Sequence, residues 1–182
     1  MASNEPTTAE VEDEIRELLR VEEIGSLAVV GLDGAPLVST MHFAADGLSV
    51  YFHTFTYTRK YAALLQDNRV GYTLEHVPAD GFAARTELRA LQMSGLATRV
   101  TDPTEMDHAI EVSHEQFDFL KEADIFKSFK RTGGAGSQVF FRIDPVEALW
   151  NDNRVRIQWR KLVKFDADAK HVAALEPYRD QA

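Results

Sequence analysis

The 182-residue sequence contains no cysteine. Disulfide bonds, thiol nucleophiles and thiolate-bound metals are therefore excluded, and a chain without thiols is typical of a reducing compartment. No apolar run approaches the roughly 20 residues of a membrane-spanning helix, and the polar, acidic N-terminus does not resemble a signal peptide. We therefore expect a cytoplasmic protein with no membrane partner.

Basic residues are also few, with 20 Lys and Arg against 29 Asp and Glu and a formal net charge of −9. Nucleic acids and anionic membranes require a broad basic face, so neither is an expected partner. A small anion needs only a local basic pocket and stays compatible with this composition. The C-terminal part of the chain contains candidate side chains for such a pocket: Arg154, Arg156, Arg160, Lys161 and Lys164.

Recognisable catalytic and metal-binding motifs are missing as well. None of the six histidines is spaced i, i+4 from another, as in a helical metal site, and no G-x-S-x-G nucleophile motif occurs. The glycine-rich segment 131–137 is not followed by Gly-Lys-Ser/Thr, so we interpret it as a connector and not as a phosphate-binding P-loop. We predict no metal site, and we expect that any chemistry belongs to a bound cofactor.

The length of the chain predicts a single domain over residues 1–182. Residues 1–6 are expected to form a loose tail. Thr7 and Glu10 make the capping-box pattern of a helix over residues 7–23. The apolar face of this helix comprises Val11, Ile15, Leu18 and Leu19.

Short strands dominate the rest of the pattern. Tight turns at Asp33-Gly34 and Asp46-Gly47 predict that three strands form an antiparallel meander. These strands cover residues 26–30, 37–43 and 48–54. A helix is expected to open at Asp102-Pro103, a capping residue followed by proline in the first turn, with an apolar stripe at Met106, Ile110, Phe117 and Leu120. The other predicted elements are helices over 58–67 and 125–129, and strands over 70–77, 86–100, 138–143, 146–150 and 154–165. Within the strand over 86–100, Gly95 is expected at a bend or at a close approach of two backbones.

The last predicted strand alternates apolar and polar residues. A pleated strand would place Arg156, Gln158 and Arg160 on the face opposite to Trp159 and Val163. Together, the many short antiparallel strands and few helices predict a mainly β (α+β) fold, a small barrel with flanking helices and a turn at Asp144-Pro145 before its C-terminal strands.

One helix start has an unfavourable charge pattern. Thr58 is a good N-cap, because its hydroxyl can accept a hydrogen bond from a free backbone amide. The next residues, Arg59 and Lys60, place two cations where the helix dipole already leaves partial positive charge. Such a turn is favourable where an anion such as a phosphate binds. On charge alone, side chains that sit in water or reach a nearby carboxylate are the alternative.

Four segments resemble a known family. Residues 53–60, HTFTYTRK, are similar to the phosphate-binding motif Y-T-N-x-x-S-R-K of the pyridoxamine 5'-phosphate oxidase-like family, the FMN-binding split barrels. Residues 67–70 resemble the N-P-R-V that follows it, and residues 95–100 resemble the G-x-A-x-R-V/L strand of the family. Trp150 followed by residues 156–160 resembles the pattern of Trp, a short turn and R-L-H-D-R.

This resemblance covers residues 23–165 and implies a split β-barrel of antiparallel strands, in a homodimer with the cofactor at its interface. It assigns Thr58, Arg59 and Lys60 to the FMN phosphate. The other implied cofactor-binding residues are Val38, Ser39, Thr40, Met41, His53, Thr54, Trp150 and Arg160, and the implied substrate-binding residues are Arg156 and Gln158. From the residues alone, Trp150 is equally compatible with core packing, and the arginines with a solvated strand face.

The sequence departs from the oxidases of this family at several positions. Val38 and Phe43 stand where the oxidases carry an arginine and a lysine. Ala90 replaces a flavin-binding glutamine, although Gln92 can point the same way, and Gln158 replaces the histidine of R-L-H-D-R. These changes remove groups that would hold the phosphate of the substrate. The resemblance therefore implies a preserved cofactor phosphate site without oxidation of vitamin B6 itself.

The implied function is an FMN-binding oxidoreductase that transfers hydride or electrons to or from a small organic substrate. Two alternatives share the fold. One is a reductase that uses the deazaflavin coenzyme, whose phosphate the Arg59-Lys60 turn could hold. The other is a non-enzymatic flavin- or haem-binding protein. A barrel without any cofactor that serves as an interaction module is a further possibility.

Overall fold

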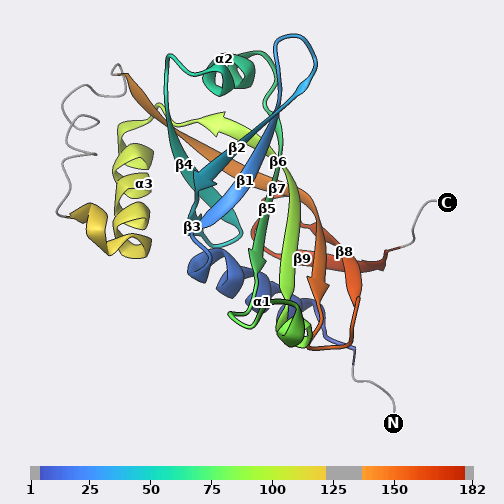
Figure 1. Cartoon of the computed structure of the whole chain (residues 1–182). Coiled ribbons are helices and arrows are strands. Elements are labelled where there is room, and N and C mark those ends of the chain that lie inside the picture. Colours follow the sequence, from blue (N-terminus) through green and yellow to red (C-terminus); the bar gives the residue numbers. More distant parts are fainter. Residues whose placement is uncertain (1–4, 122–136, 179–182) are drawn as a thin grey trace.

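The computed structural model describes residues 5–121 and 137–178 (Figure 1). The predicted helix at 125–129 and the glycine-rich residues 131–136 lie outside these ranges. The described helices are α1 (Thr8–Val21), α2 (Arg59–Gln66) and α3 (Pro103–Gln116), with 3-10 helices η1 (Gly81–Glu87) and η2 (Asp118–Lys121). Within the same ranges, no helix has the length and apolar character to cross a membrane.

Nine strands run through the described residues: β1 (Ile24–Val30), β2 (Pro36–His42), β3 (Ala44–Asp46), β4 (Ser49–Phe55), β5 (Arg69–His76), β6 (Arg89–Arg99), β7 (Gln138–Asp152), β8 (Arg160–Phe165) and β9 (Val172–Pro177). They form one sheet in the order β2-β1-β5-β6-β7-β4-β3, with β8 paired to β7 and β9 to β8. All pairs are antiparallel. The predicted mainly β, antiparallel fold is confirmed.

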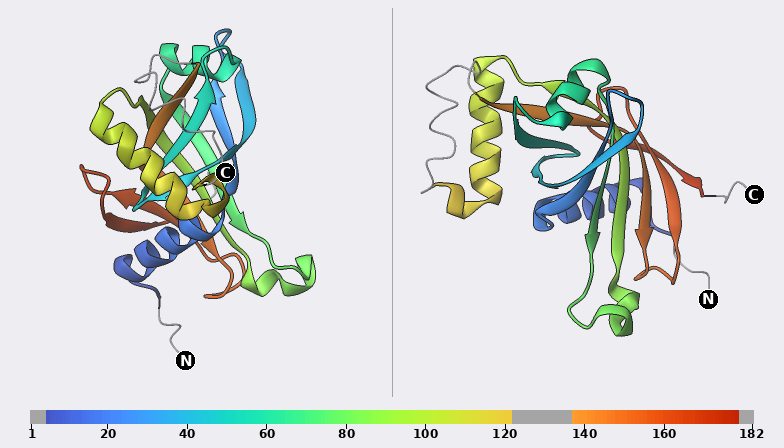
Figure 2. Two further views of the ribbon diagram at one scale, coloured as in Figure 1. Left: turned by 90° about the vertical axis from the view of Figure 1, so that its left-hand side faces the viewer. Right: turned by 45° about the horizontal axis from the view of Figure 1, so that its top comes forward.

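The sheet curls until its two ends meet. Only Phe43 separates the end of β2 at His42 from the start of β3 at Ala44, although these strands stand at opposite ends of the strand order. The views of Figures 1 and 2 show this curl. Phe43 has 0% exposure and belongs to the main apolar core. The interior of the curled sheet is therefore the core of the molecule.

The predicted meander of the first three strands is wrong. β1 pairs with β2, and β3 pairs with β4, but β2 and β4 share no ladder. The two turn glycines, Gly34 and Gly47, have left-handed φ angles of 79° and 65°, which is the conformation that tight hairpins need. These local signals predict each hairpin, but the remaining partners of β1 and β4 are β5 and β7, which come much later in the chain.

Helix α1 follows the prediction closely. Thr7 Oγ1 accepts a hydrogen bond from Glu10 N at 3.2 Å, and the Glu10 carboxylate accepts one from Thr7 N at 2.8 Å. The four predicted core residues of the helix have exposures of 1% or less: Val11, Ile15, Leu18 and Leu19. Burial of each such side chain contributes about 1.5–3 kcal/mol. In Figure 1, α1 and α2 lie at different ends of the curled sheet.

Helix α3 packs on the outside of the sheet. Asp102 caps it, with Oδ1 accepting from Thr104 N at 2.9 Å and from Glu105 N at 3.0 Å. Its buried side chains meet Tyr51 of β4 and Phe140 of β7 in a second apolar cluster. All four residues of the predicted stripe are in this cluster: Met106, Ile110, Phe117 and Leu120.

Strand β7 is continuous over 15 residues, so the predicted turn at Asp144-Pro145 is wrong. The register between β6 and β7 shifts between Ser94 and Gly95, and such a bulge tolerates a proline, which cannot donate to the ladder. The backbones come close here, because a Cβ on Gly95 would lie 2.6 Å from Ile143 Cγ2 and 2.7 Å from Asp144 O. The close approach predicted for Gly95 is confirmed.

The predicted last strand is wrong in its first half. β8 begins at Arg160, and residues 153–159 form a turn. Gln158 has a left-handed φ of 61° there, and its backbone N donates to Asn153 Oδ1 at 2.9 Å. The alternation of polar and apolar residues that predicted a pleat therefore belongs to a turn. β9 was not predicted at all.

We expect Gly95→Ala to lower the free energy of unfolding by about 1–3 kcal/mol, because the new Cβ must displace the backbone of Asp144 as well as Ile143. Urea unfolding followed by tryptophan fluorescence measures this change. Gly71→Ala on β5 is the matched control, since its Cβ would meet Met93 O at 3.6 Å, an ordinary contact. Equal stability of the two variants would contradict the close approach.

Candidate functional site

The first turn of α2 is the candidate anion site. Thr58 caps the helix: its Oγ1 accepts from Tyr61 N at 3.3 Å and donates to Phe55 O at 2.8 Å. The helix begins at Arg59 and ends before Asp67, as the sequence predicts. The free amides of its first turn, with their partial positive charge, therefore lie at the loop between β4 and α2.

Thr54 at the end of β4 links this turn to Lys60. Its hydroxyl is 3.2 Å from that of Thr58 and 3.5 Å from Lys60 Nζ, and Thr54 is only 3% exposed. Because the Thr58 hydroxyl donates to Phe55 O, Thr54 is the donor between the two hydroxyls and the acceptor from Lys60. The structure thus brings together three of the predicted site residues: Thr54, Thr58 and Lys60.

No carboxylate in the described part of the chain neutralises these cations. Within the described ranges, neither Arg59 nor Lys60 forms an ion pair, and Asp67 at the other end of α2 pairs with Arg69 at 2.6 Å. Burial lowers the pKa of Lys60, because desolvation disfavours the ammonium form. Arg59 is exposed. A cation that is partly desolvated without a counter-charge is the arrangement expected where an external anion binds.

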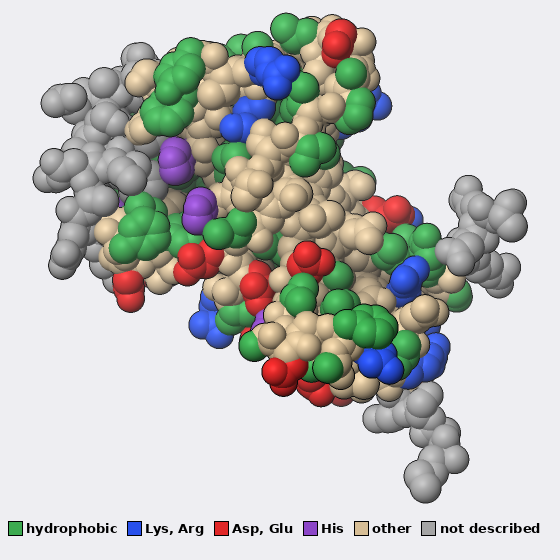
Figure 3. Space-filling view, viewed as in Figure 1, with side chains coloured by type: hydrophobic (Ala, Val, Ile, Leu, Met, Phe, Trp, Pro, Cys, Tyr) green, Lys and Arg blue, Asp and Glu red, His purple; other side chains and the backbone are tan. Residues whose placement is uncertain are grey.

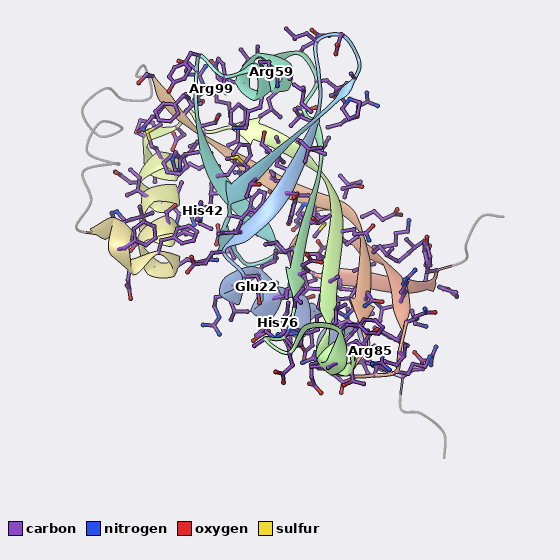
Figure 4. All side chains as sticks on the ribbon, viewed as in Figure 1. Glu22, His42, Arg59, His76, Arg85 and Arg99 are labelled. Atoms are coloured by element: carbon purple, nitrogen blue, oxygen red, sulfur yellow. The ribbon has the colours of Figure 1, made fainter. Side chains whose placement is uncertain are left out.

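Arg99 is a further cation near this site that the sequence analysis did not assign to it. It ends β6, and its guanidinium carbon lies 5.8 Å from the ring centre of Tyr61 in α2. Figure 4 shows Arg99 and Arg59 at the same end of the molecule. Arg99 is the arginine of the G-x-A-x-R-V pattern, so the sequence marks it as a family position. Its place beside α2 could not be predicted from that pattern, because it depends on strand pairing across the barrel.

The charge on this side of the molecule is unevenly distributed. In Figure 3, Lys and Arg side chains lie over α2, with histidines below them, and most Asp and Glu side chains are in the other half of the view. An acidic chain therefore has a local basic region, which is what a site for a small anion requires.

His53 lies on the other face of β4, toward α3. Desolvation lowers the pKa of His53, and the charges of His42 and Lys60 add to this effect, so the neutral imidazole is favoured. It lines an aromatic cavity of ≈ 190 Å³ with His42, Phe117 and Phe140. The His53 and Phe140 ring centres are 6.1 Å apart. No group of three or more His, Asp or Glu among the described residues is arranged to hold a metal.

The predicted flavin-lining segment is edge strand β2. Its side chains alternate: Val38 and Thr40 are exposed, whereas Ser39 and Met41 are partly buried. Val38, 67% exposed, lines an outer recess of ≈ 410 Å³ together with Gln92. The recess is otherwise bounded by small residues, which include Ser26, Ala28, Gly71, Thr73 and Ser94, and by larger ones, which include Tyr72, Glu147 and Leu162. A ligand on one face of the sheet can therefore contact the side chains of Val38 and Thr40, or those of Ser39 and Met41, but not all four.

The C-terminal residues predicted for the site lie elsewhere. Trp150 is 1% exposed and packs in the main core, which is the alternative that the sequence left open. Arg160 and Gln158 are exposed. Arg156 Nη1 donates to Glu5 Oε1 at 2.7 Å.

Strand β7 separates these residues from the anion site. Its first residue, Gln138, pairs with Phe55 beside Thr58, whereas Asn151 near its other end pairs with Arg160. Because an antiparallel strand rises about 3.4 Å per residue, Gln138 and Asn151 are roughly 40 Å apart along β7.

Figure 4 shows the same separation, with Arg59 at one end of the molecule and Arg85 at the other. Asn153 Nδ2, in the turn after β7, donates to Arg85 O at 2.7 Å, which fixes that turn at the far end. A single chain therefore cannot place both groups of predicted residues around one flavin.

We expect Lys60→Met to raise the free energy of unfolding by roughly 0.5–1 kcal/mol in the absence of ligand, because it removes a desolvated charge that has no counter-charge. Urea unfolding at pH 7 measures this. Lys164→Met is the matched control, because Lys164 pairs with Glu147 and should not gain stability when it is replaced. A less stable Lys60→Met protein would show that the ammonium group stabilises the fold and would contradict our interpretation.

Residues 11–149 match the sequence profile of the pyridoxamine 5'-phosphate oxidase family. No curated protein sequence matches the chain. Among solved structures, a heme binding protein from Mycobacterium smegmatis has a TM-score of 0.70 at 13% identity, covering 91% of this chain. The present chain spans 60% of the length of that protein.

Two further structures are similar over most of the chain. An F420 reductase is 26% identical, with a TM-score of 0.53 over 73% of this chain and 94% of that one. A FAD-binding protein from Mesorhizobium loti is 19% identical, with a TM-score of 0.55 over 74% of this chain and 89% of that one. The three proteins are described by three different cofactors, so they establish no single one here. The fold is the split β-barrel, and the chain belongs to the pyridoxamine 5'-phosphate oxidase-like family.

Proposed function

We propose that this protein is an FMN-binding oxidoreductase that transfers hydride or electrons to or from a small organic substrate. The observation that carries the proposal is the cluster at α2. The Thr54 hydroxyl is within hydrogen-bonding distance of both Lys60 Nζ and the Thr58 hydroxyl, and no carboxylate in the described part of the chain pairs with Lys60 or Arg59. Membership in the family supports the same cofactor.

The cluster fits a phosphate group. Lys60 supplies a compact charge, and the exposed guanidinium of Arg59 supplies planar donors that match two phosphate oxygens. The free amides at the start of α2 add donors without charge. Thr54 is buried below them, so it closes the inner side of the site to water. Cations, hydroxyls and amides together match a dianionic phosphate.

When bound, the flavin supplies the redox chemistry, and the protein positions it. The lowered pKa of His53 favours its neutral form, so the cations Lys60, Arg59 and Arg99 determine the local potential. Two positions that are basic in the oxidases of the family, and would hold the phosphate of the substrate there, carry no charge here. Phe43 is fully buried, and Val38 is an exposed aliphatic residue. A substrate without a phosphate group is therefore the better match.

We further propose a homodimer in which the C-terminal residues of one chain complete the FMN site of the other. The length of β7 supports this, because one chain cannot bring Arg160 to α2. The outer face of the sheet also supports it: its recess of small residues lies among exposed Val38, Leu96 and Val146. Few charged side chains lie in the middle of the face in Figure 3. Arg69 and Glu147 are the charged residues that line the two recesses, and the largely uncharged surface between them suits a second copy.

A deazaflavin coenzyme is the second candidate, because the chain is 26% identical to an F420 reductase and the same turn suits the coenzyme phosphate. A bound deazaflavin would give blue fluorescence and would not react with oxygen, unlike FMN. Haem is the non-enzymatic alternative, supported by the likeness to the mycobacterial heme binding protein. An intense haem absorption band on reconstitution identifies it.

We expect the protein to bind FMN roughly 100-fold more tightly than riboflavin, which lacks the phosphate. The double variant Arg59→Ala/Lys60→Ala should lose this preference and bind FMN roughly 100-fold more weakly, because hydrogen bonds to charged groups contribute about 1.5–3 kcal/mol each. Its riboflavin affinity should not change. Titration of flavin fluorescence measures all four affinities.

Arg69→Ala is the control for this titration. Arg69 follows the same helix but pairs with Asp67, so its loss should leave the preference for FMN intact. An equal loss in Arg69→Ala, or an unchanged preference in the double variant, would refute the phosphate assignment.

Mixed dimers test the shared site. We expect that Arg59→Ala/Lys60→Ala chains and Arg160→Ala chains each bind little FMN alone. After joint unfolding and refolding in equal amounts, about a quarter of the wild-type binding capacity should return, because half of the dimers are mixed and each holds one intact site. Equilibrium dialysis measures the capacity. No recovery, with mixed dimers demonstrated by mass spectrometry, would contradict a site built from two chains.

A further inference from the structure

A second basic cluster surrounds Glu5, at the end of the molecule away from α2. Arg156 Nη1 donates to Glu5 Oε1 at 2.7 Å, and Trp159 Nε1 donates to Glu5 Oε2 at 2.8 Å. Lys161 Nζ lies 3.5 Å from the same Oε2. Glu5 and Arg156 are 151 residues apart in the sequence. Both oxygens of one carboxylate thus have donors from a single distant segment.

The donors are arranged as in a carboxylate site that solvent can reach. Trp159 is 1% exposed, so its N–H is a fixed and desolvated donor, whereas the Glu5 side chain is 43% exposed. The hydrogen bonds from Trp159 and then Arg156 lower the Glu5 pKa to about 2, so the carboxylate is ionised at neutral pH. An ionised group held at the surface by a buried donor can be exchanged for another carboxylate.

Glu5 is not required to begin the first helix. The capping box of Thr7 and Glu10 already satisfies the first turn of α1. The Glu5 contacts are therefore not needed for the start of α1. They connect the N-terminal segment to the turn before β8.

A cavity adjoins the cluster on the side of α1. It has a volume of ≈ 400 Å³ and is bounded by apolar residues, Pro6, Val11, Trp150, Val155 and Trp159, and by the carboxylates of Glu10, Glu14 and Asp152. Its one cationic side chain, Arg154, pairs with Asp152 at 2.6 Å and also with Glu14, so it offers no free charge. Glu10 is held in the capping box, and Glu14 and Asp152 pair with Arg154, while the rest of the lining is apolar. The space beside Glu5 thus suits an uncharged apolar or aromatic group, and its carboxylates would repel a second negative charge.

We propose that Arg156, Lys161 and the Trp159 indole form a binding site for a small aromatic or apolar carboxylate, and that Glu5 occupies this site as an internal competitor. An incoming carboxylate takes over the three donors while its apolar body enters the neighbouring cavity, and Glu5 with Pro6 moves away. Binding of the carboxylate is independent of any flavin, whereas a role in turnover rests on the function proposed above.

Benzoate is the probe, and flavin-free protein labelled with ¹⁵N-tryptophan is the sample. The chain has two tryptophans, so two indole N–H signals are expected, and Trp159→Phe identifies the Trp159 signal by its loss. Glu5→Gln removes the competing charge but keeps an amide oxygen for the indole. If Glu5 fills the site about nine-tenths of the time, the variant should bind benzoate about tenfold more tightly than the wild type.

Two further variants make the test specific. Glu111→Gln, an exposed α3 carboxylate without a polar contact among the described residues, makes the same charge change and should bind benzoate as the wild type does. Adding Arg156→Gln to Glu5→Gln should weaken benzoate binding at least about tenfold. Equal affinity of Glu5→Gln and wild type, or an unchanged affinity after the loss of Arg156, overturns the proposal.

A second readout needs no variant. In flavin-free wild-type protein labelled uniformly with ¹⁵N, saturating benzoate should shift the Glu5 backbone amide signal together with the Trp159 indole signal, because the two groups separate. A shift at Trp159 without one at Glu5 overturns the exchange. Since no flavin is present, none of these results depends on the FMN site.

Discussion

Antiparallel pairing along β7 is the constraint on which the rest of the structure depends. This strand pairs with β6 over most of its length, with β4 at its beginning and with β8 at its end. It therefore sets the position of the loop into α2 and of the C-terminal turn at the same time. Because it holds them roughly 40 Å apart along the strand, any ligand that touches both must lie between two chains. The argument for the proposed dimer is therefore this separation between the two groups of residues, because the barrel fold alone does not require a second chain.

The two basic clusters of the chain differ in one physical respect. Arg156 and Lys161 have a carboxylate of their own, Glu5, whereas Arg59 and Lys60 have none in the described part of the chain. The first cluster is thus satisfied internally, and an external anion must displace Glu5. The second leaves the desolvated charge of Lys60 uncompensated, which costs stability until an anion arrives. In a chain with a net charge of −9, such a cation is explained best by a ligand.

Local signals in the sequence predicted local structure well. The caps at Thr7, Thr58 and Asp102 depend on contacts within four residues, and each begins a helix as predicted. Features that depend on residues far apart in the sequence were not predicted, or were predicted wrongly. The partners of β1 and β4, the position of Arg99 beside Tyr61, and the left-handed turn at Gln158 depend on residues far away in the chain. The alternating pattern before β8 predicted a strand because periodicity alone does not distinguish a pleat from a turn that buries Trp159 and Val155.

The same distinction between local and distant contacts applies to the candidate site. The Thr58-Arg59-Lys60 turn is a contiguous motif, and the structure adds the contact with Thr54. The contribution of a second chain is implied by the family resemblance, because no local pattern of residues indicates it. The visible spectrum of the purified protein after incubation with FMN and removal of free flavin tests the central claim most directly. We predict a yellow protein with FMN bound at about one per chain. A protein that stays colourless would contradict the account.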